Sequence, residues 1–161
     1  MGIEVLKILK VYYGEDINIW GVGSDCNLED YGLKDVISLG KMGSDLELAN
    51  IFRRAHICLL FSFESNNPNV FLQCMACGCA VITNYNEKYK SLLKNKENAI
   101  VTEPNLDSLI DNIINLIDDF RLRDRIVFNA LNFIENPWEN LFNNLLKFIP
   151  NVHFLCFWII K

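Results

Sequence analysis

The sequence predicts an α/β fold, a Rossmann-like, doubly wound parallel sheet in a single domain. Short apolar runs alternate along the chain with amphipathic helical segments, as in successive βαβ units. Runs such as HICLLF at His56–Phe61 are apolar at nearly every position, which is typical of strands buried on both faces. The chain has 161 residues, 51% of them hydrophobic, which is enough for one packed core.

The first half of the chain predicts two helices among short strands. Ile3–Tyr13 has apolar residues at helical spacing and ends at Gly14, so it predicts a helix. SDLE at residues 44–47 is a capping box that opens a second helix to about Ala55, with Leu46 and Phe52 among its core-facing residues. Asn27–Lys34 predicts a short helical turn. The strands expected in this half are Asp16–Trp20, Val36–Leu39 and His56–Phe61.

The segment 61–84, FSFESNNPNVFLQCMACGCAVITN, carries the strongest indication of a ligand site. A polar loop follows the strand, and Asn67 and Pro68 suit the cap and first turn of a helix to Cys77. Gly78 ends that helix, and Ala80–Thr83 is the next buried strand. The loop therefore lies at the carboxyl end of a parallel strand beside a helix N-terminus. Ligands bind there in open α/β sheets, and the helix end favours a phosphate.

The second half of the chain is predominantly helical. Asn105 caps a helix at Leu106–Phe120, in which Leu109 and Ile113 belong to an apolar stripe. The other elements expected are a lysine-rich loop or short helix at Tyr85–Asn95, a strand at Ala99–Thr102, and helices at Arg121–Ile134 and Trp138–Phe148. We expect one domain over residues 1–148 and an apolar tail of unknown role over residues 149–161.

Composition excludes several classes of function. The net charge is −5, the pI is about 5.0 and no basic patch stands out, which argues against nucleic-acid binding. No run of 18 apolar residues predicts a membrane span. The six cysteines and the absence of a secretory signal favour free thiols in a reducing compartment, the cytoplasm. A metal or redox module at Cys74, Cys77 and Cys79 is a minor alternative, because two of them fall on a core-facing helix side.

The segment 61–84 also resembles the donor-site segment of GT-B glycosyltransferases, more closely the large retaining family that includes rhamnosyl- and mannosyltransferases. That family has a Ser, a first Glu, a short loop, a second Glu, then Ala-Met-Ala-Cys-Gly and a Pro-Val-Val-like strand. The match here is Ser62, Glu64, Met75–Gly78 and Ala80–Ile82. The resemblance covers about residues 1–148.

The resemblance implies the C-terminal, donor-binding half of an enzyme of polysaccharide biosynthesis. Such an enzyme moves a sugar from a nucleotide-diphosphate sugar, with anomeric retention and without a bound metal or other cofactor. Glu64 would be catalytic, accepting hydrogen bonds from the donor sugar and stabilising positive charge at its anomeric carbon. The alternative interpretation, a solvated loop carboxylate, is the less favoured one for Glu64. The donor-binding residues would be Ser62, Asn66, Asn67, Asn69, Val70, Gln73 and Asn84.

Among these, Asn67, Asn69 and Val70 would offer backbone N–H groups to the diphosphate, although every helix start offers such groups. Gln73 would contact the ribose and Asn84 the donor. The acceptor, a saccharide or a lipid-linked one, would be bound by a missing N-terminal domain. A lipid-linked acceptor would bring the enzyme into peripheral contact with a membrane.

The chain departs from the family pattern in ways that favour an alternative. The position of the second glutamate falls on Gln73, which carries no charge and lies one residue farther from Glu64 than in the family. The family's first strand and its phosphate-contacting Arg and Lys have no counterpart; Lys88 and Lys90 read better as a solvated face. The alternative is a non-catalytic remnant, or a nucleotide-binding module lacking the acceptor domain.

The unassigned first strand is central in the doubly wound order. The strands Asp16–Trp20 and His56–Phe61 should flank its position, where unpaired backbone groups would be costly. We expect these two strands either to pair directly or to be bridged by the apolar tail, HFLCFWII. An isolated chain of this kind is predicted to be marginally stable and prone to aggregate through open strand edges.

Overall fold

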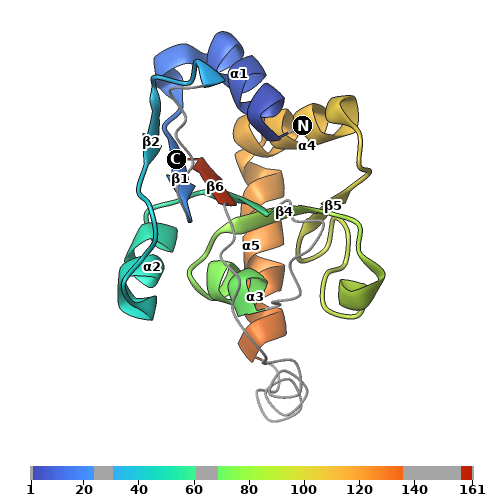
Figure 1. The fold of residues 1–161 in the computed structure, drawn as a ribbon. Coiled ribbons are helices and arrows are strands. Elements are labelled where there is room, and N and C mark those ends of the chain that lie inside the picture. The colour runs from blue at the N-terminus through green and yellow to red at the C-terminus, as the bar shows by residue number, and fades with distance from the viewer. Residues whose placement is uncertain (1, 24–30, 61–68, 136–156, 161) are drawn as a thin grey trace.

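The structure, a computed structural model, describes residues 2–23, 31–60, 69–135 and 157–160. These residues form one six-stranded sheet in the order β2-β1-β6-β3-β4-β5, with helices on both faces (Figure 1). The strands are β1 Ile19–Val22, β2 Val36–Ser38, β3 Ile57–Leu60, β4 Ala80–Asn84, β5 Ile100–Thr102 and β6 Phe157–Ile160. The helices are α1 Gly2–Tyr13, α2 Asp45–Phe52, α3 Asn69–Ala76, α4 Leu106–Asp118 and α5 Phe120–Glu135, with 3-10 turns η1 Gly14–Asp16 and η3 Glu87–Tyr89.

The sheet separates two hydrophobic clusters, as expected for a doubly wound fold. Ile57 and Leu59 of β3 pack with residues of α1 and α4, whereas Cys58 and Leu60 pack with residues of α2 and α3. Successive residues of a strand point to opposite faces, so an all-apolar strand serves both clusters. In Figure 1, α1 and α4 lie on one side of the sheet and α2 and α3 on the other. The predicted α/β, Rossmann-like single-domain fold is confirmed.

The centre of the sheet is filled by the C-terminal strand β6. It pairs antiparallel with β1 on one side and β3 on the other, and His56 N also donates to Ile160 O at 3.0 Å. The side chain of Ile160 is 2% exposed. The prediction that the apolar tail would bridge the two flanking strands is therefore confirmed. The expectation of an all-parallel sheet needs one correction: a strand of either direction satisfies the backbone groups of β1 and β3, and β6 enters antiparallel.

The predicted strand Asp16–Trp20 starts too early. Gly14 ends α1 with φ +54°, and η1 then takes up residues to Asp16, so β1 begins only at Ile19. The amino group of Lys10 donates to the backbone oxygens of Gly14 (3.0 Å) and Ile17 (3.3 Å). A lysine in the last turn of α1 thus satisfies two carbonyls of the segment that follows the helix, and it holds the turn into β1 in place.

The start of α2 was predicted correctly, but the helix ends at Phe52, before the predicted Ala55, and one of its predicted core residues is exposed. Glu47 N donates to Ser44 Oγ at 3.3 Å, and the Glu47 carboxylate accepts from Gly43 N at 2.8 Å, which forms a capping box. Leu46 is 67% exposed, so its predicted core position is wrong. The helix α2 packs through its later residues, and Phe52 at its end is fully buried.

The second half agrees with the sequence pattern where it is described. Asn105 Oδ1 accepts from Ser108 N at 2.8 Å and caps α4, whose Leu109 and Ile113 are buried. The predicted helix Trp138–Phe148 lies outside the described residues. No helix in the described part of the chain is long and apolar enough to cross a bilayer.

Candidate functional site

The candidate site lies at the edge of the sheet where the parallel strands end. β3 ends at Leu60, and α3 begins at Asn69 on the far side of the predicted donor loop. Thr83 Oγ1 donates to Leu60 O at 2.8 Å, which ties the end of β4 to the end of β3. Both ends of the loop are therefore fixed on the scaffold. Four of the predicted site residues lie in segment 61–68, outside the described residues: Ser62, Glu64, Asn66 and Asn67.

The helix α3 presents the next three predicted residues. Its buried side is formed by Phe71, Cys74 and Met75, which anchor it to the sheet. Asn69, Val70 and Gln73 are all half-buried. The first turn of α3 carries the positive end of the helix dipole, at the ligand edge of the sheet. The chemistry available there is backbone N–H donors, with the Gln73 amide about one turn farther along.

Asn84, the last predicted site residue, borders a hollow of about 250 Å³. Asn84 ends β4, and the hollow continues over η3 and the following loop toward β5. Its walls combine amides, phenols, lysines and apolar side chains. They are Thr83, Asn84, Tyr85, Asn86, Tyr89, Lys90, Leu93, Lys94, Asn95 and Val101. Amides and phenols hydrogen-bond hydroxyl groups and apolar side chains cover C–H faces, so the lining suits a hydroxyl-rich ligand.

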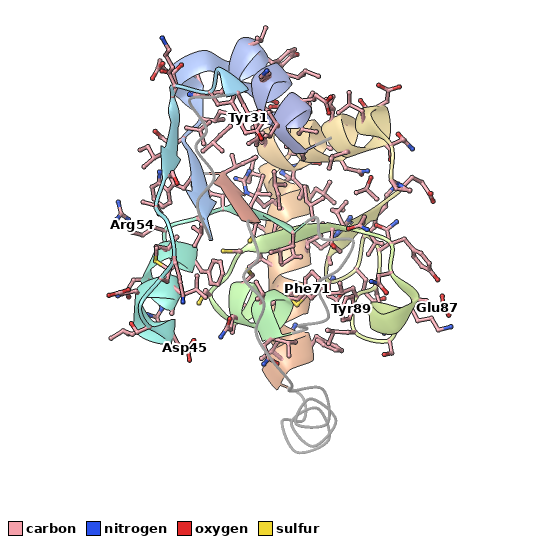
Figure 2. All side chains as sticks on the ribbon, in the orientation of Figure 1. Tyr31, Asp45, Arg54, Phe71, Glu87 and Tyr89 are labelled. Atoms are coloured by element: carbon pink, nitrogen blue, oxygen red, sulfur yellow. The ribbon has the colours of Figure 1, made fainter. Side chains whose placement is uncertain are left out.

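An aromatic contact joins the hollow to α3. The rings of Phe71 and Tyr89 meet edge to face with centroids 5.1 Å apart. Figure 2 shows these two rings next to each other, with Glu87 farther out on the same side. The wall formed by η3 therefore rests directly on the helix whose first turn borders the donor loop. This contact holds the η3 wall of the hollow against α3.

The loop behind the hollow is held by a buried amide. Asn98 is 2% exposed; its Oδ1 accepts from Lys94 N at 2.8 Å and its Nδ2 donates to Leu92 O at 2.9 Å. Asn95 Oδ1 accepts from Val101 N at 3.0 Å. Such hydrogen bonds replace the regular ladder that the loop lacks, so the hollow has a fixed wall.

The outer rim carries a charged cluster of which the sequence analysis named only Lys90, as part of a solvated face. The Glu87 carboxylate accepts hydrogen bonds from the Lys90 amino group and the Tyr85 hydroxyl. The hydrogen bond from Lys90, and to a smaller extent that from Tyr85, holds the pKa of Glu87 below its usual value. The hydrogen bond to Glu87 in turn raises the pKa of Tyr85. Lys94 pairs with Glu97 at 3.3 Å. In the sequence, this cluster was indicated only by the alternation of amide, phenol, acidic and basic side chains in NYNEKYK, residues 84–90.

Cys58, Cys74 and Cys79 are buried free thiols, and Cys77 is a half-buried one. Cys74 Sγ lies 3.2 Å from Cys58 Sγ, and Cys79 Sγ donates to Phe52 O at 3.0 Å. Burial, above all, raises the pKa of Cys74 well above its usual value and also raises that of Cys79. Thiols in such surroundings stay protonated and unreactive. Within the described residues, no group of three or more His, Cys, Asp or Glu side chains is placed to hold a metal.

Comparison with known proteins identifies relatives of this chain. The family profile described as "Glycosyl transferases group 1" matches residues 3–119. The O-antigen biosynthesis protein RfbC of Myxococcus xanthus is 26% identical over 153 residues, which span 94% of this chain but only 12% of that protein.

Solved structures share the fold. WaaG, a glycosyltransferase involved in lipopolysaccharide biosynthesis, superposes with a TM-score of 0.74 at 15% identity, over 93% of this chain and 43% of that one. The C-terminal domain of LpcC from Francisella tularensis gives 0.58 at 23% identity, over 69% and 58%. Anabaena Alr3699/HepE in complex with UDP gives 0.57 at 19% identity, over 74% and 35%. With a profile match over most of its length and a GT-B Rossmann-like fold, the chain belongs to the glycosyl transferases group 1 family.

Proposed function

We propose that this chain is the C-terminal, donor-binding half of a retaining glycosyltransferase that uses a nucleotide-diphosphate sugar. The observation that carries the proposal is the hollow beside Asn84, which lies on the same sheet edge as the start of α3. A phosphate-favouring helix end and a hydroxyl-favouring hollow together match the two parts of such a donor. Family membership supports the same class of substrate.

In this proposal the residues take the roles that the resemblance of the donor segment implies. The diphosphate lies against the first turn of α3, with the N–H groups of Asn69 and Val70 as donors. Gln73 hydrogen-bonds the ribose, and Asn84 contacts the sugar in the hollow. Glu64, in the loop between β3 and α3, stabilises the positive charge that develops at the anomeric carbon as the diphosphate leaves. Ser62, Asn66 and Asn67 complete the loop around the donor.

No bound metal is required in this scheme. The helix dipole and backbone N–H groups stabilise the leaving diphosphate. The acceptor is a saccharide or a lipid-linked saccharide bound by another domain. The similarity to an O-antigen biosynthesis protein, of which this chain spans about one eighth, supports a place in polysaccharide assembly, and the resemblance of the donor segment supports a rhamnosyl or mannosyl transfer.

The experiment that tests the proposal is calorimetric titration with nucleoside diphosphates and their sugar conjugates. We expect at least one nucleoside diphosphate and its sugar conjugate to bind. The Asn84→Ala variant should lower the affinity for the sugar conjugate only, by roughly three- to tenfold for one lost hydrogen bond. The matched control is Asn115→Ala, an exposed asparagine on α4 away from the hollow, which should change nothing. Absence of binding by every member of the panel would contradict the proposal.

A second candidate function is a nucleotide-binding module without catalytic activity. It is favoured by one observation, the uncharged Gln73 at the position of the family's second glutamate. Such a module would bind a nucleoside diphosphate as tightly as its sugar conjugate, and Asn84→Ala would be neutral for both. The same titration therefore separates the two functions.

A further inference from the structure

The slot between β1 and β3 is one strand wide and is filled by a strand from the opposite end of the chain. β1 and β3 do not pair with each other; the partners of β6 run from Ile19↔Ile160 to Val22↔Phe157 on one side and from Ile57↔Ile160 to Leu59↔Trp158 on the other. Two strand spacings leave a slot of roughly 10 Å between β1 and β3. With the slot empty, both neighbours would present unpaired N–H and C=O groups in the middle of the sheet.

The pairings of β6 are far less local than those of the other strands. Register partners in β1–β2, β3–β4 and β4–β5 lie 17, 23 and 18 residues apart, as in Ile19↔Val36. By contrast, Ile19 and Ile160 are 141 residues apart. The entropy of closing so long a loop delays the contact, so β6 is expected to dock last. Until then, two neighbouring edges are open to any strand of the right pattern.

The tether of β6 does not restrict it to its own chain. The 21 residues 136–156 separate the end of α5 from β6, and a segment of this length reaches at most roughly 75 Å. A neighbouring chain offers the same strand, and its chance of entering the slot rises with protein concentration, whereas that of the chain's own strand does not. The elements that contact β6 most are β1 and β3, and exchange with an identical chain would recreate the same pairings.

We propose that two copies of this chain exchange their β6 strands reciprocally, each filling the slot between β1 and β3 of the other. The occupant of the slot is then a second copy of this chain. The inference does not depend on the proposed glycosyltransferase function.

Engineered disulfides test the exchange in the full-length chain. Ile19 and Ile160 are register partners within the same core cluster, so cysteines at both positions lie near disulfide distance. One variant carries Ile19→Cys and the other Ile160→Cys; they are unfolded together under reducing conditions, refolded and oxidised. We expect a covalent mixed dimer whose fraction rises at least about tenfold between micromolar and near-millimolar protein, because encounter scales with concentration.

The controls separate exchange from other crosslinking. The chain with both substitutions should form the bond within itself at low concentration. Ile37→Cys, on the outer strand β2 and not a partner of β6, should give no dimer with Ile160→Cys. Internal bonding in the double variant, without mixed dimers at any concentration, overturns the proposal.

If the double variant fails to fold, the wild-type chain supplies the answer. Unlabelled and ¹⁵N-labelled chains are refolded together at high concentration, diluted, and examined by native mass spectrometry. Mixed-mass dimers that survive dilution and disappear in Trp158→Pro, which breaks the β6 ladder, support exchange. Absence of such dimers, or dimers that persist in Trp158→Pro, overturns it.

Discussion

Replacing Ile160 by alanine should be among the most damaging single changes in the described core. Ile160 is 2% exposed and lies in the cluster shared by α1, α4 and the central strands. The substitution removes three carbons, worth about 2.4 kcal/mol of transfer free energy at about 0.8 kcal/mol each. The cavity left in a sheet centre adds to this, so we expect a loss of about 3–4 kcal/mol in the free energy of unfolding.

The matched control is the same substitution on the outer strand. Ile37 of β2 is 53% exposed, so Ile37→Ala should cost less than about 1 kcal/mol. Urea unfolding followed by far-UV circular dichroism measures both. With an m-value of about 2–3 kcal/mol per molar, the midpoint should fall by about 1–2 M for Ile160→Ala and by less than about 0.5 M for Ile37→Ala. Measurements at micromolar protein keep strand exchange out of the comparison.

Equal midpoint shifts in the two variants would refute the reasoning. That result would mean that β6 is not an integral strand of the sheet and that the slot between β1 and β3 is closed in another way. A change in m without a change in midpoint would indicate an altered denatured state instead, and would also count against the packing argument.

In the complete enzyme, Glu64→Gln should lower turnover by about a hundredfold or more with unchanged circular dichroism, because one electrostatic contact of this kind is commonly worth roughly 3 kcal/mol; near-normal transfer would remove Glu64 from the mechanism. Cys58 and Cys74 should not react with a thiol reagent in the folded protein but should react fully in denaturant, and unchelated protein should contain no stoichiometric zinc by elemental analysis. Because its folded pKa is lowered, Glu87 should keep its hydrogen bonds with Lys90 and Tyr85 above its ordinary pKa of 4.5 and lose them only as the pH falls through the lowered value; an NMR titration that places the Glu87 midpoint at or above 4.5 would contradict this.

Local pattern in the sequence determined most of the elements and their caps. Asn105 and Ser44 mark helix starts because their side-chain oxygens accept from the first-turn N–H groups, a contact within three residues. Buried-run strands such as Ile57–Leu60 are recognisable because both of their faces need apolar residues. The family, too, was recognisable from the sequence, since Ser62, Glu64 and the Met-Ala-Cys-Gly run occur with their strand and helix.

Only the tertiary structure decided the direction and register of the C-terminal strand and which surfaces remain open. The apolar run at the chain end has no period of its own; its antiparallel place depends on partners 103 and 141 residues away, at Ile57 and Ile19. Leu46 has a core-like position in the helical pattern but is exposed, because α2 packs by its other end. The hollow needs Tyr89 to rest on Phe71, a contact between separate elements. Pairing and packing across such distances depend on the whole fold, whereas caps and periodicity depend only on neighbouring residues.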